Sequence, residues 1–142
     1  MSSTKKASWP KRNFVYLLGF LVPFLILGMI FAKNQIVPFG DNIYLRSDMY
    51  HQYAPFYSEL WNKLRNGEGL TYSWNIGMGT DFTSLFAYYL ASPINWIIVL
   101  FPQKYMIEIM NSLIILKLAA SSLLITYYIS KHFNTKNCSI AL

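Results

Sequence analysis

The chain has 142 residues, of which 54% are apolar, 18% are aromatic and only 13% are charged, and its formal net charge is +6. Soluble domains carry about 25% charged residues, so this composition argues against a free-standing soluble protein and favours a membrane protein. The basic residues are divided between the flanks of apolar blocks and form no continuous stripe, which argues against nucleic-acid binding.

The longest apolar block runs from Phe14 to Ala32 and contains 19 residues without a charge. As a helix it would extend about 28 Å, which matches the hydrocarbon thickness of a bilayer. A cleaved signal peptide is the alternative, but the run is too long for one and Phe31 stands where a small residue is needed. We therefore predict a retained transmembrane helix over 14–32, preceded by a basic cytoplasmic N-terminus over 1–13.

Residues 33–85 are predicted to form an external loop with one amphipathic helix. Apolar and aromatic side chains recur at helical spacing at Tyr50, Tyr53, Ala54, Tyr57, Leu60, Trp61 and Leu64. Pro55 suits a first turn and Gly67 an end, so we expect a regular helix over about 54–66, flat on the outer membrane surface. Its opposite face is polar and includes the i,i+4 pair Glu59 and Lys63. A glycine-rich connector over 66–81 follows.

Two further apolar segments come next. Residues 86–101 are interrupted by Ser92-Pro93 and Asn95, and their length suits either an interfacial or re-entrant helix or a third span. Residues 106–130 are predicted to form a transmembrane helix, although Lys117 lies near its middle. Glu108 falls on the opposite helical face, so we expect the partner of Lys117 to lie elsewhere.

The distribution of charge predicts the topology. All six acidic residues lie between positions 41 and 108, whereas both ends carry only basic side chains. The positive-inside rule then places both termini in the cytoplasm and requires an even number of crossings, with 131–142 as a cytoplasmic tail. Three spans, with an exposed C-terminal tail, are the alternative. The predicted class is an all-α integral membrane protein.

Several catalytic signatures are absent from the sequence. The glycines match neither nucleotide-binding pattern, and no G-x-S-x-G elbow exists. Cys138 is the single cysteine, so neither an internal disulfide nor a cysteine metal site is available. Asp48 and His51 could share a cation, but two ligands are too few, and no metal site is predicted. Carboxylates of the loop, Asp41 and Asp48, remain as candidate bases, each with a structural alternative as a turn or helix-start residue.

Five ordered motifs carry a resemblance to a known family. They are V-P-F-G-D, S-D-M-Y-H-Q-Y, Y-S-W-N-I-G-M-G, A-Y-Y-L-A-S-P-I-N and L-F-P. In this order and spacing they resemble the N-terminal part of the bacterial YfhO-like membrane proteins, over about residues 12–132. That family is similar in turn to the GT-C class of multi-pass glycosyltransferases, whose first external loop bears amphipathic juxtamembrane helices.

The resemblance implies an enzyme of the bacterial cytoplasmic membrane. It would take a sugar from a polyprenyl-phosphate carrier and pass it to a cell-envelope acceptor such as teichoic acid. In that class an Asp of the first external loop is the catalytic base, which corresponds best to Asp48 and next to Asp41. The expected substrate-binding residues are Arg46, Tyr50, His51, Gln52, Tyr53, Trp74 and Lys117. No cofactor is predicted, and a need for a divalent metal stays open.

The chain departs from the family pattern in length. Relatives have many more spans, so we expect an amino-terminal fragment that is inactive alone and needs the remaining transmembrane helices of the full-length protein as partners, beside the membrane lipid. Two other hypotheses stay open. One is a non-catalytic membrane scaffold, and the other is an oligomeric transporter-like subunit in which Lys117 faces a shared pore.

Overall fold

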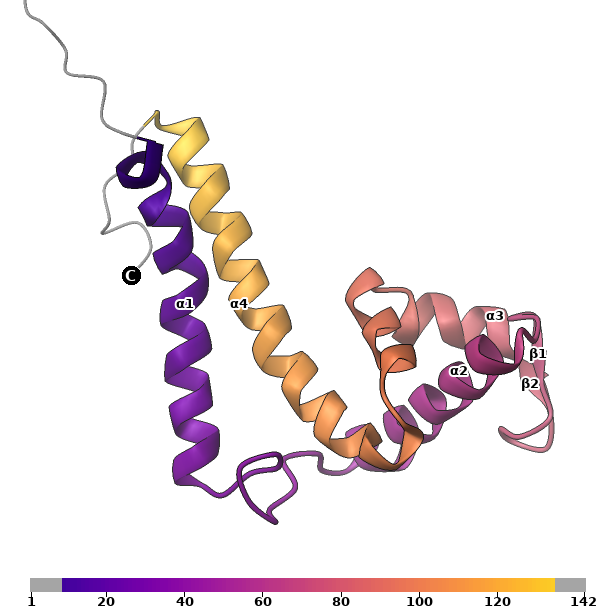
Figure 1. The fold of residues 1–142 in the computed structure, drawn as a ribbon. Coiled ribbons are helices and arrows are strands. Elements are labelled where there is room, and N and C mark those ends of the chain that lie inside the picture. Colours follow the sequence, from indigo (N-terminus) through magenta and orange to yellow (C-terminus); the bar gives the residue numbers. More distant parts are fainter. Residues whose placement is uncertain (1–8, 135–142) are drawn as a thin grey trace, which may run out of the picture. The chain divides into compact units, whose positions relative to one another are not determined.

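The computed structural model describes residues 9–134, and side chains from Asn13 onward. Lys5, Lys6, Cys138 and most of the predicted tail lie outside the described residues. The chain divides into two compact units. The span unit consists of the described residues up to Phe31 and from Ile114 onward, and the loop unit is Ala32–Leu113. Figure 1 shows their elements in chain order.

The two long helices are α1, Trp9–Lys33, and α4, Met106–His132. Within the described residues, Asn13–Lys33 and Gln103–His132 are long and apolar enough to cross a membrane. The span expected over 14–32 lies inside α1, which continues through Pro23. Such a proline is tolerated in membrane helices because neighbouring groups satisfy the freed carbonyl.

Within the span unit, α1 and α4 contact each other through a small residue. A Cβ atom placed on Gly19 would lie 2.5 Å from Oγ1 of Thr126, so only glycine fits there. The rings of Tyr16 and Tyr127 lie 5.7 Å apart, one helical turn away. Close approach at a small residue is a usual way for helices to associate in lipid.

The loop unit begins its helical part at η1, a π-helix over Met49–Tyr53, which continues directly into α2, Ala54–Asn66. The α2 helix therefore covers the residues for which the periodicity predicts a helix. Gly67 ends it in the left-handed conformation, with φ of 67°, as its position in the sequence suggests.

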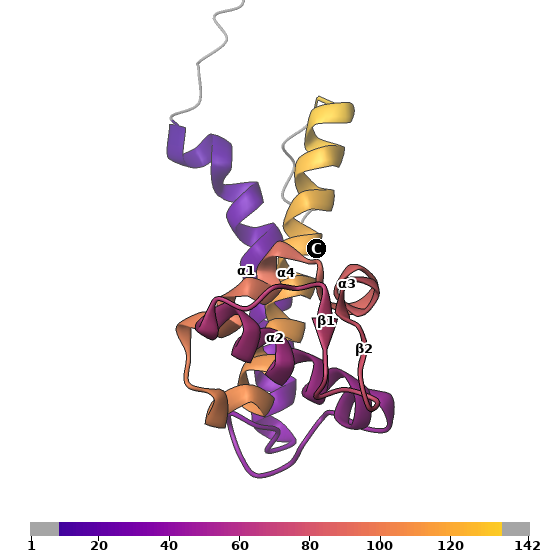
Figure 2. The same ribbon diagram turned by 90° about the vertical axis from the view of Figure 1, so that its right-hand side faces the viewer.

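The glycine-rich connector after α2 contains a short antiparallel hairpin. Its strands are β1, Tyr72–Ser73, and β2, Thr80–Asp81, visible in Figure 2. Tyr72 pairs with Asp81, and Ser73 pairs with Thr80. Gly77, Met78 and Gly79 all have positive φ, which is why two of the three turn positions are glycine.

The apolar segment after the hairpin is broken. It consists of α3, Phe82–Leu85, η2, Phe86–Leu90, and η3, Pro93–Leu100, before η4, Gln103–Tyr105, leads into α4. The pieces Phe82–Leu90 and Pro93–Leu100 meet at 104°, and together they are long and apolar enough for a broken span or a re-entrant loop. The segment 86–101 is thus not one straight helix, because Ser92-Pro93 interrupts it.

A buried asparagine fixes this break against α2. Asn95 is fully buried, accepts a hydrogen bond of 2.7 Å from the hydroxyl of Tyr57 and donates one of 3.0 Å to the carbonyl of Leu90. Burial raises the pKa of Tyr57 to about 12. Around this contact lies the apolar core of the loop unit, with Leu60 and Ile98 also fully buried.

Candidate functional site

The six carboxylates of the chain differ in what holds them. Asp81 has a structural role at the start of α3, because its side chain accepts from the backbone N–H of Thr83 at 3.0 Å and from the Ser84 hydroxyl. The Ser84 hydrogen bond is the main cause that lowers the pKa of Asp81. An aspartate committed to capping in this way is a poor candidate for a base.

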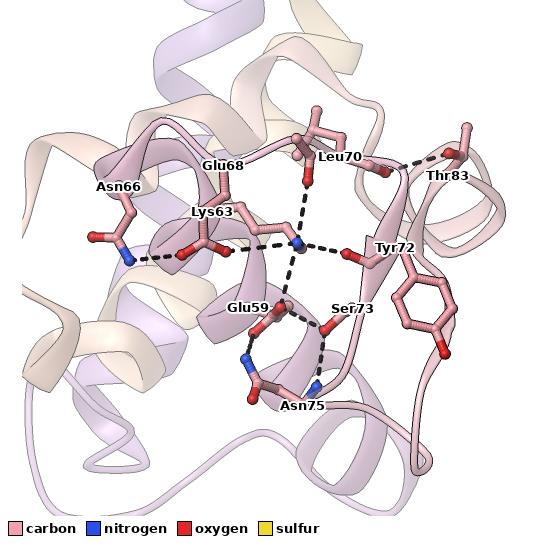
Figure 3. Close-up of polar contacts among 10 residues, drawn as sticks. Glu59, Lys63, Asn66, Glu68, Leu70, Tyr72, Ser73, Asn75 and Thr83 are labelled. Carbon is pink, nitrogen blue, oxygen red and sulfur yellow. Dashed lines mark hydrogen bonds and ion pairs between the residues drawn. The ribbon is translucent and has the colours of Figure 1, made fainter.

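Glu59 also has a structural role, because it and Lys63 are buried although they lie on the polar face of α2. Glu59 and Lys63 are each only 4% exposed. The carboxylate of Glu59 accepts hydrogen bonds from the Ser73 hydroxyl at 2.5 Å and from the Asn75 side chain at 3.0 Å (Figure 3). The two charges are buried because the 67–81 segment folds over this face of the helix, which periodicity within α2 cannot reveal.

Lys63 completes this buried network. Its Nζ donates to the carbonyls of Gly69 at 3.1 Å and Tyr72 at 2.8 Å, and lies 3.7 Å from the Glu59 carboxylate. Glu68 lies 3.8 Å away on the exposed side. Figure 3 shows these contacts converging on one ammonium group. The network thus holds the hairpin on α2 and leaves neither charge available for chemistry.

Three carboxylates remain, namely Asp41, Asp48 and Glu108. Among the described residues, none of their side chains has a hydrogen bond or an ion pair. Glu108 lies in the candidate span of α4 and is partly buried, whereas Asp41 and Asp48 are exposed in the loop unit. The two candidate bases named from the sequence are therefore the two exposed acids without a structural contact.

Asp41 lies in a turn that its neighbour closes. The backbone N–H of Asn42 donates to the carbonyl of Gln35 at 2.9 Å, and the carbonyl of Asn42 accepts from the N–H of Val37 at 2.8 Å. The Asn42 side chain donates to the carbonyl of Asn34 at 2.9 Å. The Asp41 carboxylate is not needed for this turn.

Asp48 precedes η1 but does not cap it with its side chain. The start of η1 is held by the Ser47 carbonyl, which accepts from the N–H groups of Tyr50 and His51, each at 3.0 Å. A π-helical turn is uncommon and frequently marks a functional site. The alternative role for Asp48, organising the start of the helix, thus has no hydrogen bond to support it.

The other predicted site residues form two groups. Arg46, Tyr50, His51 and Gln52 are exposed on or just before η1, and the rings of Tyr50 and His51 meet edge to face at 5.5 Å. Tyr53 packs edge to face on Tyr89 at 4.9 Å. These residues share one short segment with Asp48.

Trp74 and Lys117 belong to other parts of the chain. Trp74 is 78% exposed on the hairpin and stacks edge to face with Tyr72 at 4.9 Å. Lys117 belongs to the span unit and is partly buried in α4. Among residues 9–134, no three His, Cys, Asp or Glu side chains form a cluster that could hold a metal ion.

Sequence reasoning missed the polar contacts that shape the loop unit. Asn95 carried a visible signal, since it is a lone amide in an apolar block beside Pro93, but its partner Tyr57 was assigned only to the apolar face of α2. The spacing of Glu59 and Lys63 was visible too, yet nothing in α2 itself indicated that Ser73 would cover them.

Comparison with known proteins identifies the family. The family model described as bacterial membrane protein YfhO matches residues 19–142, which is most of the chain. Comparisons with curated proteins and with solved structures find no match. The match includes the greater part of the candidate span Asn13–Lys33, all of the candidate span Gln103–His132 and every predicted site residue. The chain therefore belongs to the YfhO family of bacterial membrane proteins.

Proposed function

We propose that this protein takes part in sugar transfer from a polyprenyl-phosphate carrier to a cell-envelope acceptor such as teichoic acid, at the outer face of the bacterial cytoplasmic membrane. Membership of the YfhO family and the resemblance of its motifs to GT-C glycosyltransferases support this activity. A lipid-linked donor needs no nucleotide site, and the sequence has no glycine-rich phosphate loop.

The observation that carries the proposal is the state of Asp48. Its carboxylate is exposed, has no partner among the described residues and lies at the start of the π-helical turn η1. As general base it takes the proton of an acceptor hydroxyl. The acceptor oxygen then bonds to the anomeric carbon while the bond from that carbon to the carrier phosphate breaks and its electron pair stays on the phosphate. A single displacement inverts the anomeric centre.

The neighbouring residues have supporting roles in this proposal. Arg46 provides positive charge for the leaving phosphate. Lys117 is a substrate-binding candidate from the family resemblance alone. Tyr50, Tyr53 and Trp74 offer aromatic faces to the sugar or the prenyl chain. His51 and Gln52 donate hydrogen bonds to sugar or phosphate oxygens. Both termini of the chain are assigned to the cytoplasm and the loop unit to the exterior, in line with the positions of the basic residues.

A transfer assay tests the proposal. Bacterial membranes that contain the full-length protein, with Asp48→Asn introduced into its native gene, are supplied with a radiolabelled polyprenyl-phosphate sugar and with acceptor polymer. Wild-type membranes should label the acceptor, and Asp48→Asn should reduce the rate by about 100-fold or more, since a positioned base contributes that much. Full transfer by Asp48→Asn, or none by the wild type, would contradict the assignment and favour a membrane scaffold.

A further inference from the structure

A cavity of about 390 Å³ lies in the loop unit, between the start of α2 and the start of α4. Its volume falls in the range typical of small-molecule sites, about 300–1,000 Å³. The polar groups that line it are Tyr50, Ser58, Gln103 and Lys104. Ser58, Gln103 and Lys104 have no role in the sugar transfer proposed above. The transfer chemistry assigned to η1 therefore does not explain this cavity.

The charge of this cavity is positive. Lys104 is its single charged lining residue, and no carboxylate lines it. Among the described residues Lys104 forms no ion pair, and its Nζ lies 4.8 Å from the centre of the Tyr105 ring. The N-terminal end of α4 adds a partial positive charge to the same wall. These groups suit an anionic ligand with several acceptor oxygens.

The remaining lining is apolar, and its location indicates a lipid. Ala54, Pro55, Met106 and Ile107 contribute hydrocarbon surface beside the polar groups. Gln103 is the first residue of the candidate membrane span Gln103–His132, so the cavity lies at the end of a span, where lipid headgroups are found. A ligand that satisfies both surfaces has an anionic head and an apolar tail.

We propose that this cavity binds the phosphate group of a lipid, with Lys104 as its charged contact and the hydroxyls of Tyr50 and Ser58 as hydrogen-bond donors. Two lipids carry this chemistry, a polyprenyl phosphate and a membrane phospholipid. Identification of the ligand with the sugar carrier rests on the proposed function. Tyr50 supports that identification, because it lines the cavity and belongs to η1, directly after Asp48.

A binding measurement that does not depend on transfer tests the proposal. The protein in phosphatidylcholine nanodiscs is titrated with a short-chain polyprenyl monophosphate, with the matching uncharged polyprenol and with inorganic phosphate. Lys104→Met should weaken binding of the polyprenyl phosphate about tenfold or more, since a hydrogen bond to a charged group contributes roughly 1.5–3 kcal/mol. Lys104→Arg should bind within a few fold of the wild type.

Lys131→Met is the matched control. Lys131 lies at the other end of α4, and its Nζ is 5.7 Å from the ring of Tyr127, a setting like that of Lys104. It should bind as the wild type does. Ala54→Phe, which fills the cavity and leaves its charge intact, should also weaken binding. Unchanged affinity in both Lys104→Met and Ala54→Phe, or equal affinity for polyprenyl phosphate and for the uncharged polyprenol, would overturn the proposal.

Two further measurements are needed. One distinguishes polyprenyl phosphate from phospholipid as the ligand, and the other separates lipid-phosphate binding from the assignment of Asp48 as the base. Competition by phosphatidylglycerol as strong as that by polyprenyl phosphate would assign the site to phospholipid, which keeps the lipid-phosphate inference and removes the link to the donor. Asp48→Asn should bind polyprenyl phosphate unchanged while losing transfer. Lost binding in Lys104→Met together with full transfer in Asp48→Asn would retain this site and refute the proposed base.

Discussion

The carboxylate side chains of this protein differ from one another in the hydrogen bonds and ion pairs that they form. Asp81 caps a helix, Glu59 is buried with Lys63, and Glu68 approaches the same lysine. Asp41 and Asp48 are exposed without such contacts among the described residues. An acid free of structural contacts can be replaced without unfolding the protein, so variants at these two positions report on chemistry.

Asp41 provides the matched comparison for Asp48. Both residues precede α2 in the loop unit and both are exposed, but only Asp48 adjoins η1. We expect Asp41→Asn to transfer sugar within about twofold of the wild type, while Asp48→Asn loses transfer, since only the correctly placed base matters. Rates of acceptor labelling in the two membrane preparations test this. The opposite pattern would move the base to Asp41.

The buried hydroxyl of Tyr57 should make the stability of the fold depend on pH. Because burial raises its pKa to about 12 from 10.0, the folded state favours the neutral phenol. Its contribution to stability is therefore fully present below pH 10 and is lost as the pH rises through about 12. In a spectrophotometric titration of the tyrosines, Tyr57→Phe should remove one ionisation near pH 12.

Tyr57→Phe also has an effect at neutral pH. It leaves Oδ1 of the fully buried Asn95 without its donor, and we expect a loss of about 1–3 kcal/mol in the free energy of unfolding. The exposed Tyr88 supplies the control variant Tyr88→Phe, which should match the wild type in stability. Equal stability of the two variants would show that the Tyr57–Asn95 contact does not hold the broken segment on α2.

At the scale of elements, α2 shows both the reach and the limit of sequence reasoning. The periodicity of its apolar residues, Pro55 and Gly67 predict its bounds, because these signals are local. The burial of its polar face was not predictable, because it depends on Ser73 and Asn75, which reach Glu59 only after the hairpin folds back. Short strands of two residues leave no alternation that a sequence pattern could reveal.

The buried pair on α2 predicts a large loss of stability. Lys63→Met leaves the Glu59 charge buried without its cation, which should cost about 3–5 kcal/mol. Arg65→Met, an exposed basic residue on the same helix, should cost far less. Thermal unfolding of both variants in one detergent measures the difference. Similar unfolding temperatures would mean that the hairpin does not depend on this network.

Because α1 and α4 approach closely at Gly19, we expect a larger side chain there to destabilise the span unit. Gly19→Ala would place Cβ 2.5 Å from Oγ1 of Thr126, and the resulting overpacking should cost about 1–3 kcal/mol. Gly28→Ala is the matched control, because nothing lies within 4 Å of a Cβ there. Addition of Thr126→Gly to Gly19→Ala should recover stability. Equal thermal stability of Gly19→Ala and Gly28→Ala would contradict this packing.

For the whole molecule, composition and length indicated a helical membrane protein, and family membership agrees with that class. The spans were predictable because lipid imposes a minimum apolar length. The segment 86–101 was harder: Ser92-Pro93 indicated an interruption, but neither the 104° bend nor the contact of Asn95 with Tyr57, 38 residues away, follows from a local pattern. Most of the predicted site residues lie on η1 or just before it. The cavity at Lys104 had no sequence signal, because its walls come from separate parts of the chain.

The proposed sugar transfer depends most on the side of the membrane that the loop unit occupies. Met78 is 97% exposed in that unit, and Cys138 is the single native cysteine, which is cytoplasmic in the proposed topology. Intact cells expressing Met78→Cys are treated with a membrane-impermeant maleimide, and the same cells are treated again after permeabilisation. We expect Cys at position 78 to react in intact cells and Cys138 only after permeabilisation. Labelling of Cys138 alone in intact cells would place the loop unit inside and contradict the proposed transfer.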